Sequence, residues 1–99
     1  NARIHFLALG IVVVLGIFFR IGWIEWMAIA IVSGFVISME LINTAIERLA
    51  DFVEPNRNEV IGLIKDYCAG AVLVSAVMSL VVGGIIFIPR MIEVIKAFW

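Results

Sequence analysis

Residues 67–89 read YCAGAVLVSAVMSLVVGGIIFIP, a run of 23 residues without a charged side chain. At about 1.5 Å of rise per residue, this run makes a helix of roughly 35 Å, and about 20 apolar residues are enough to cross the hydrocarbon core of a bilayer. Two other uncharged runs precede it, at residues 6–19 and 26–39. Each has 14 residues, so each spans a membrane only if its flanking residues join it.

The composition of the whole 99-residue chain also favours a membrane protein. Hydrophobic residues make up 65% and charged residues 15%, whereas about 25% of residues are charged in soluble domains. Such a composition excludes an intrinsically disordered chain. Seven Lys and Arg against eight Asp and Glu leave a net charge of −1, so we expect no nucleic-acid partner. A single cysteine excludes an internal disulfide.

We therefore predict an all-α integral membrane protein with one domain, residues 1–99, and three transmembrane helices per subunit. The helices are placed at about residues 4–22, 25–50 and 58–88. A short turn at 22–25 joins the first two, and the polar loop 51–57 joins the second to the third. Asn58 is the expected N-cap of the third helix, and residues 90–99 are expected to form a short helix lying in the membrane interface.

Basic residues orient these spans only weakly. With three spans, the N-terminus and the 51–66 segment share one side of the membrane. That side carries four basic residues, Arg3, Arg48, Arg57 and Lys65, and the other side carries three, Arg20, Arg90 and Lys96. Because cytoplasmic segments are richer in Lys and Arg, the 51–66 segment is predicted to be cytoplasmic.

The second helix carries carboxylates at membrane depth. Four polar residues fall on one stripe of this helix, within about 80° of each other at 100° per residue: Glu40, Asn43, Glu47 and Asp51. Glu40 and Glu47 lie about 10.5 Å apart along the axis. A charge in the bilayer costs several kcal/mol, so such residues usually mark function. The simpler interpretation, a helix end that reaches water, explains Asp51 better than Glu40.

Three kinds of chemistry suit this stripe. It can hold a divalent cation through hard oxygens, supply a general base to a lipid hydroxyl, or relay a proton or ion. Lys65 and Asp66, at the polar end of the third helix, add weight to the first two, because a cation beside oxygen ligands suits a phosphate with a metal. Spacing alone does not choose among the three, and a small ion- or proton-conducting protein remains the alternative.

The segment ELINTAIE at residues 40–47, followed by Lys65 and Asp66, resembles the small bacterial integral-membrane lipid kinases, the diacylglycerol and undecaprenol kinases. The resemblance covers essentially the whole chain. It implies a homotrimer of three-helix subunits in the bacterial inner membrane, with ATP and Mg²⁺ bound between subunits at the cytoplasmic face. The implied reaction is phosphorylation of a membrane lipid alcohol.

The resemblance also implies roles for individual residues. Glu40 is the expected catalytic base toward the lipid hydroxyl, and Glu47 is an expected metal ligand. The remaining expected contacts of the site are Asn43, Asn56, Arg57, Asn58, Lys65 and Asp66, with the nucleotide reached through Lys65, Asp66 and the loop residues.

Two departures from the family pattern bear on these expectations. The family has an amphipathic surface helix before its first span and a second metal-binding glutamate that aligns just upstream of Asn1, and neither lies in residues 1–99. His5 stands where the diacylglycerol branch tends to have Glu, and Ala69 where it often has Ser. Both favour a polyprenol as the acceptor.

Overall fold

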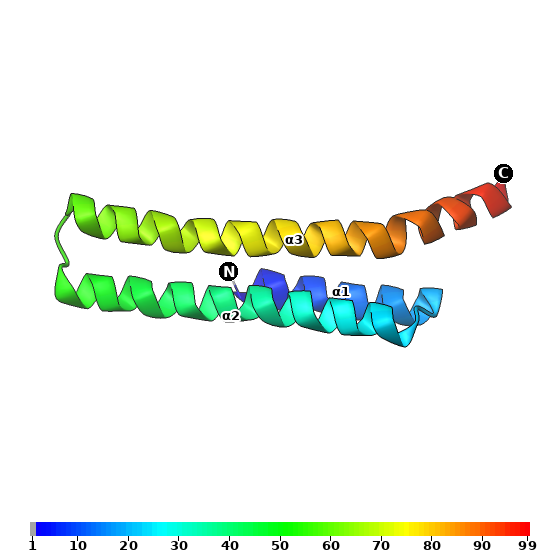
Figure 1. Cartoon of the computed structure of the whole chain (residues 1–99), viewed down its shortest axis with the longest axis horizontal. Helices are drawn as coiled ribbons and strands as arrows, with labels where there is room; N and C mark the ends of the chain where they lie inside the picture. The colour runs from blue at the N-terminus through cyan, green and yellow to red at the C-terminus, as the bar shows by residue number, and fades with distance from the viewer. Residues whose placement is uncertain (1) are drawn as a thin grey trace.

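The computed structural model describes residues 2–99 and is all-helical. Its three helices are α1 (Ala2–Phe19), α2 (Trp23–Val53) and α3 (Glu59–Phe98). They run up, down and up in one elongated bundle of 58 × 22 × 20 Å. Figure 1 shows that α1 starts about halfway along α2, so that only α2 and α3 lie side by side toward the 54–58 loop. The predicted all-α class is confirmed.

The turn between α1 and α2 lies at residues 20–22, slightly earlier than the predicted 22–25. Arg20 adopts a left-handed conformation with φ of 53°. The backbone N–H of Ile21 donates to the carbonyl of Gly16, and that of Arg20 to the carbonyl of Ile17. This pair of hydrogen bonds is the Schellman arrangement, which satisfies carbonyls that a helix end otherwise leaves unpaired.

The main apolar core lies beside this turn. Ile21, Ile29, Ile86 and Phe87 are buried together there. Trp26 packs against this cluster, and its ring also lies over Gly16 of α1. A Cβ on Gly16 would come within 2.5 Å of the Trp26 ring, so only glycine allows this close approach. The core therefore depends on α3 reaching back over the first two helices.

The loop between α2 and α3 ends in a strong helix start. As predicted, Asn58 is the N-cap of α3: its Oδ1 accepts hydrogen bonds from the N–H groups of Val60 at 2.9 Å and Ile61 at 3.2 Å. These bonds satisfy donors that would otherwise lack partners, which fixes where α3 begins. α2 ends at Val53, and Glu54 is extended, as expected for a residue directly before a proline, here Pro55.

The opposite end of the bundle is held by an ion pair. Both guanidinium nitrogens of Arg90 donate to the Glu25 carboxylate, at 2.6 and 2.7 Å. Glu25 also accepts the backbone N–H of Gly22, the residue before α2, so the start of α2 and the far part of α3 are tied together. Bidentate pairs of this kind are the stronger class of charged hydrogen bond.

The expected separate helix at residues 90–99 is instead a continuation of α3. The helix passes through Pro89 and ends at Phe98, and Figure 1 shows it bending away from α2 toward its C-terminus. Proline removes one intrahelical hydrogen bond and favours a kink, but it does not end the helix here.

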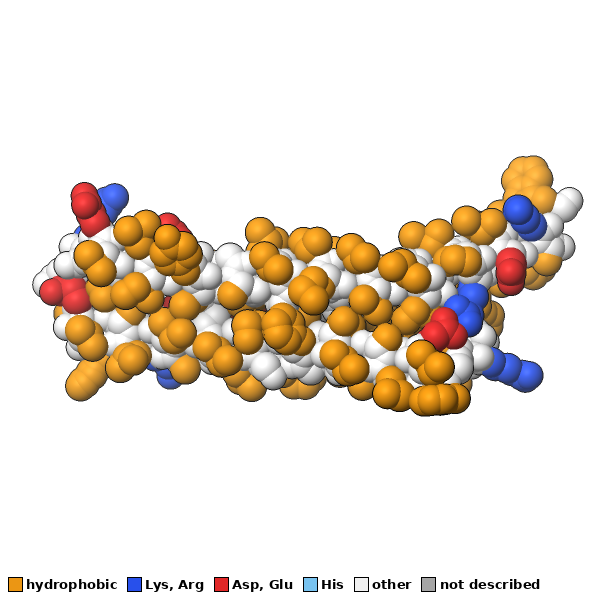
Figure 2. Space-filling view, viewed as in Figure 1, with side chains coloured by type: hydrophobic (Ala, Val, Ile, Leu, Met, Phe, Trp, Pro, Cys, Tyr) orange, Lys and Arg blue, Asp and Glu red, His pale blue; other side chains and the backbone are white. Residues whose placement is uncertain are grey.

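Two of the helices are long and apolar enough to cross a membrane, α2 and α3, while α1 is a shorter apolar helix. Figure 2 shows hydrophobic side chains along the middle of the molecule and charged side chains at its two ends. Large apolar side chains are exposed on all three helices, for example Leu7 at 67%, Ile31 at 67% and Leu80 at 75%. Exposed apolar surface on this scale marks a lipid or protein contact.

Candidate functional site

Glu40 lies on α2 at the level where α1 begins. Oε2 of its carboxylate is 3.3 Å from Nε2 of His5, and both side chains are largely shielded, at 14% and 21% exposed. The hydroxyl of Thr44 donates to the Glu40 carbonyl at 3.0 Å, so this threonine bonds back to its own helix. Glu40 is thus a partly buried carboxylate held against the first turns of α1.

Asn43 and Glu47 continue the face of α2 that Glu40 begins. The Oδ1 atom of Asn43 is buried and has no hydrogen-bond partner in the part of the chain that the structure describes. Glu47, one helical turn further along, is half-buried. An unpaired buried oxygen beside a carboxylate is an unusual feature of a helix surface, because buried polar groups almost always have partners.

Lys65 joins α3 to the same end of α2. Its Nζ donates to Oδ1 of Asp51 at 2.6 Å. The Glu47 carboxylate lies close enough to Lys65 to attract its charge. Lys65 therefore pairs with Asp51 and is attracted by Glu47 at longer range, and it neutralises part of the negative charge of α2 at this end.

The other expected nucleotide contacts lie on the loop and on the outer side of α3. Asn58 uses its side-chain oxygen to cap α3, and Asn56 donates its backbone N–H to Glu54. Arg57 and Asp66 are exposed. The structure thus brings Glu47 and Lys65 together, and it leaves the loop residues and Asp66 outside that cluster.

Whether Mg²⁺ fits this site depends on the side chains that can act as its ligands. Among residues 2–99, no group of three or more His, Cys, Asp or Glu side chains surrounds one point. Mg²⁺ does not need such a cage in kinases, since it is bound by one or two carboxylates together with phosphate oxygens and water. The Glu47 carboxylate and the unpaired oxygen of Asn43 are hard ligands that match this partial set.

Two contacts of the site were not predicted as such. His5 contacts Glu40 and Asp51 contacts Lys65, although neither His5 nor Asp51 is among the expected site residues. A signal was present: in an antiparallel helix pair, residues at similar distances from the turn lie at the same level. His5 and Glu40 are 17 and 18 residues from Gly22, and Asp51 and Lys65 are each seven residues from Asn58.

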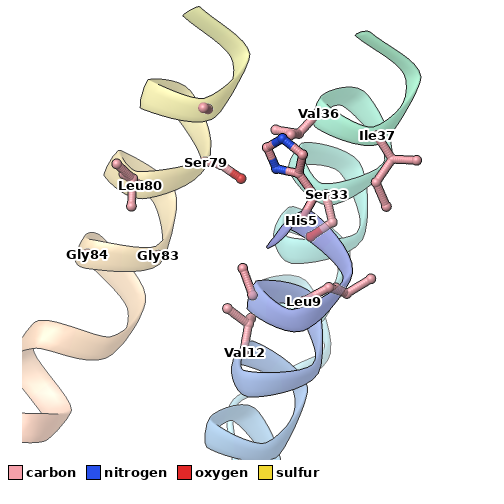
Figure 3. Close-up of a pocket in the computed structure, with 12 residues that line it drawn as sticks. His5, Leu9, Val12, Ser33, Val36, Ile37, Ser79, Leu80, Gly83 and Gly84 are labelled. Atoms are coloured by element: carbon pink, nitrogen blue, oxygen red, sulfur yellow. The ribbon is translucent and has the colours of Figure 1, made fainter. Parts of the chain in front are cut away.

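A cavity of about 490 Å³ lies between α3 and the pair formed by α1 and α2. Figure 3 shows His5, Ser33 and Ser79 among its otherwise apolar lining. The lining includes a stripe of three small residues of α3, spaced three and four positions apart: Ala76, Ser79 and Gly83. A Cβ on Gly83 would meet no atom within 4 Å, so this part of the stripe does not bring the helices of one chain into close contact.

Comparison with known proteins gives two kinds of match. The family described as prokaryotic diacylglycerol kinase matches residues 1–87. The undecaprenol kinase of Bacillus subtilis (strain 168) is 37% identical over 91 residues, which cover 92% of this chain and 74% of that protein. The diacylglycerol kinase of Synechocystis sp. (strain ATCC 27184 / PCC 6803 / Kazusa) is 32% identical over 94 residues, or 94% of this chain and 54% of that protein. No solved structure matches significantly.

Proposed function

The chain belongs to the prokaryotic diacylglycerol kinase family, and we propose that it transfers the γ-phosphoryl group of ATP to the hydroxyl of undecaprenol in the bacterial inner membrane. That the chain is a lipid kinase follows from the family and its relatives. We propose, in addition, the identity of the lipid acceptor, the metal, the oligomeric assembly and the orientation in the membrane.

The proposal depends on the position of Glu40 along the helix axis, at the same height as the start of α1. Helix α1 has 18 residues, about 27 Å, which is close to the thickness of the hydrocarbon core. If α1 spans the core as the first of three spans, its first turns mark one membrane boundary. Glu40 contacts His5 in those turns, and so it lies where the hydroxyl of a membrane lipid reaches the aqueous surface.

Glu40 is the proposed general base. It takes the proton of the lipid hydroxyl while the hydroxyl oxygen forms a bond to the γ-phosphorus of ATP. The bond between that phosphorus and the oxygen bridging to ADP breaks, and ADP leaves with the electron pair. Such a transfer depends on positioning and charge neutralisation more than on covalent chemistry by the protein.

The phosphate groups of ATP are proposed to bind near three residues: Asn43, Glu47 and Lys65. Glu47 and Asn43 would hold Mg²⁺ through their oxygens, and a bound Mg²⁺ supplies neutralisation of phosphate charge. Lys65 would bind phosphate oxygens directly, and it is held in place by Asp51. Arg57, Asn56, Asn58 and Asp66 are proposed to contact the rest of the nucleotide.

We also propose that the site is completed by a second subunit of a homotrimer. α1 leaves the charged end of α2 and α3 without a third helix (Figure 1). Large apolar side chains are also exposed on all three helices. Both features suit packing against further subunits.

The test is transfer of label from [γ-³²P]ATP to lipids in bilayers that contain either undecaprenol or diacylglycerol. We expect labelled undecaprenyl phosphate to form faster than phosphatidate, and Glu40→Gln to lower the rate by about 10²–10⁴, the usual contribution of a general base. Glu93→Gln, an exposed carboxylate in the last turns of α3, is the matched control and should keep the parent rate.

Faster labelling of diacylglycerol would overturn the choice of acceptor, and near-normal turnover by Glu40→Gln would overturn the role of Glu40. The conducting alternative makes a different prediction. Vesicles that pass protons but label neither lipid would support it and exclude the proposed reaction for this chain.

A further inference from the structure

The cavity between α3 and the pair formed by α1 and α2 adjoins the proposed site. On α2 it is lined by Val36 and Ile37, which precede Glu40 by one helical turn. On α1 its lining extends from His5 to Val12, seven residues further along that helix and so about 10 Å further from the membrane boundary proposed above. The cavity therefore runs from near the level of Glu40 into the apolar part of the molecule.

The walls of this cavity suit a hydrocarbon. Its volume is about 490 Å³, within the range of roughly 300–1,000 Å³ that is usual for cavities that bind small molecules. The lining is apolar apart from three side chains: His5, Ser33 and Ser79. A polar group that entered such a space without a partner would cost about 1–3 kcal/mol, whereas a hydrocarbon chain has no such cost.

The cavity is open on one side. Val36 is 5% exposed, whereas Leu80, which also lines the cavity, is 75% exposed. Gly83 lies one turn beyond Leu80 on α3, and Figure 3 shows it beside the gap between the helices. Because a Cβ on Gly83 would meet no atom within 4 Å, the space next to this residue is not filled by the chain itself. A lipid chain can therefore enter beside Leu80 and extend as far as Gly83.

We propose that this cavity holds the isoprenoid chain of the lipid acceptor, with the hydroxyl end toward Glu40 and the following isoprene units directed toward Gly83. A polyprenol has one chain, and hydrocarbon begins directly after the carbon that bears its hydroxyl. Diacylglycerol has two chains and two ester groups at that point, so it would bring carbonyl groups into apolar walls. This inference rests on the proposed function, since it assumes that the hydroxyl is phosphorylated near Glu40.

Ser33 and Ser79 are the hydroxyl groups available to ester carbonyls in this cavity. A serine within a helix commonly donates to a carbonyl of the preceding turn, as Ser75 does to Val72 at 2.7 Å. Ser79→Ala makes the wall more apolar, so it should keep or strengthen the preference for undecaprenol over diacylglycerol. A loss of diacylglycerol phosphorylation alone would show that the hydroxyl binds an ester, and it would overturn the assignment.

The kinetic test fills the deep end of the cavity. Gly83→Leu adds an apolar side chain where the backbone leaves room for it, and leucine favours a helix more than glycine does, so the fold should be kept. We expect kcat/KM for undecaprenol to fall at least about tenfold, as is usual when the size of an apolar pocket changes. Gly10→Leu, an exposed position of α1 that also has no atom within 4 Å of an added Cβ, is the matched control and should match the parent.

Acceptors of different length test the direction of the chain. Ala76 and Gly83 both line the cavity and are seven residues apart, about 10 Å along α3. With the parent, kcat/KM should rise steeply from prenol, which has one isoprene unit, to farnesol, which has three, because the added units enter the cavity. Gly83→Leu should remove most of that rise. A parent that uses both alcohols alike, or a variant that keeps the rise, would overturn the proposal.

A binding measurement needs no phosphoryl transfer. A farnesol analogue with a photoreactive diazirine on its third isoprene unit is irradiated with the protein in bilayers without ATP. We expect cross-links to residues 76–84 in the parent and fewer in Gly83→Leu, and competition by undecaprenol but not by dioleoylglycerol. Cross-links that avoid residues 76–84, or equal competition by dioleoylglycerol, would overturn the assignment.

The two measurements separate this inference from the proposed function. A parent that phosphorylates no lipid but binds the analogue at residues 76–84 would exclude the proposed reaction and keep the chain site. An active parent without those cross-links would exclude only the chain site. Loss of subunit cross-linking in Gly83→Leu but not in Gly10→Leu would also overturn it, because a neighbouring subunit would then fill the cavity in place of a lipid chain.

Discussion

Gly16 is the residue at which a single methyl group decides the packing of α1 on α2. Alanine normally stabilises a helix interior relative to glycine by about 0.5–1 kcal/mol. At Gly16 the added Cβ would lie 2.5 Å from the Trp26 ring, and overpacking of this kind costs about 1–3 kcal/mol. We therefore expect Gly16→Ala to destabilise the protein.

Gly10 on the same helix provides the matched control. A Cβ at Gly10 would meet nothing within 4 Å, so Gly10→Ala should be neutral or stabilising. Unfolding in detergent, followed by the fluorescence of tryptophan, measures both. A change of stability in the same direction for both substitutions would show that Gly16 is not closely packed against Trp26.

Glu47 is the residue whose proposed role concerns the metal. Removing its charge in Glu47→Gln takes away one hard ligand, so half-saturation of activity should move to several-fold higher Mg²⁺. Glu59→Gln, an exposed carboxylate at the same end of the molecule, should leave the Mg²⁺ titration unchanged. If the Mg²⁺ titration curves of Glu47→Gln and the parent coincide, Glu47 is not a ligand of the metal.

At the scale of elements, the pair formed by Glu25 and Arg90 links α2 to α3 at the end away from the site. Both side chains are about 30% exposed, at 28% and 30%, so solvent screens part of their attraction. Ion pairs that water screens in this way contribute little to stability on their own. Because Glu25 also accepts the Gly22 N–H, a single substitution would mix two effects.

A double-mutant cycle of Glu25→Gln and Arg90→Gln isolates the pair. We expect a small favourable coupling between the two side chains. The Arg90 variant alone should lose slightly more stability, because Arg90 also donates to the Ile86 carbonyl, while glutamine at position 25 keeps an oxygen that accepts the Gly22 N–H. Strictly additive effects would show that the pair does not hold α3 against α2. Lipid kinase activity should change little, since the site lies at the other end.

At the scale of the whole molecule, one chain leaves a large apolar surface and an incomplete charged end. The proposed trimer, with each site shared between two subunits, predicts complementation. Glu40→Gln and Lys65→Met are each expected to be nearly inactive alone. Mixed in equal amounts and reassembled, they give both an intact Glu40 and an intact Lys65 to about a quarter of the shared sites.

The measurement is lipid phosphorylation by the mixed assembly, with chemical cross-linking to count subunits. Recovery of about a quarter of parental activity supports shared sites. A mixture no more active than its components would mean that each subunit carries its own complete site, and a cross-linked dimer or tetramer would replace the trimer.

The sequence by itself was sufficient for the helices. Uncharged runs, the N-cap Asn58 and the proline-bearing loop place every helix boundary except the end of α3 within about three residues, because helix formation depends on local composition. The segment at residues 40–47 with Lys65 and Asp66 likewise identified the family. The continuation of α3 through Pro89 was missed, since proline disfavours a helix locally. Arg90, the next residue, donates to the Ile86 carbonyl and to Glu25 of α2, two contacts that sequence does not predict.

The tertiary structure decided the contacts between helices. His5 with Glu40, Asp51 with Lys65, and Glu25 with Arg90 each join residues on different helices. The register that pairs them depends on two details, the left-handed turn at Arg20 and the start of α3 after Asn58. A shift of one residue in either turn would rotate a helix by about 100° and separate the pairs. Residue periodicity gives the face of a helix, but only the packed bundle shows what that face meets.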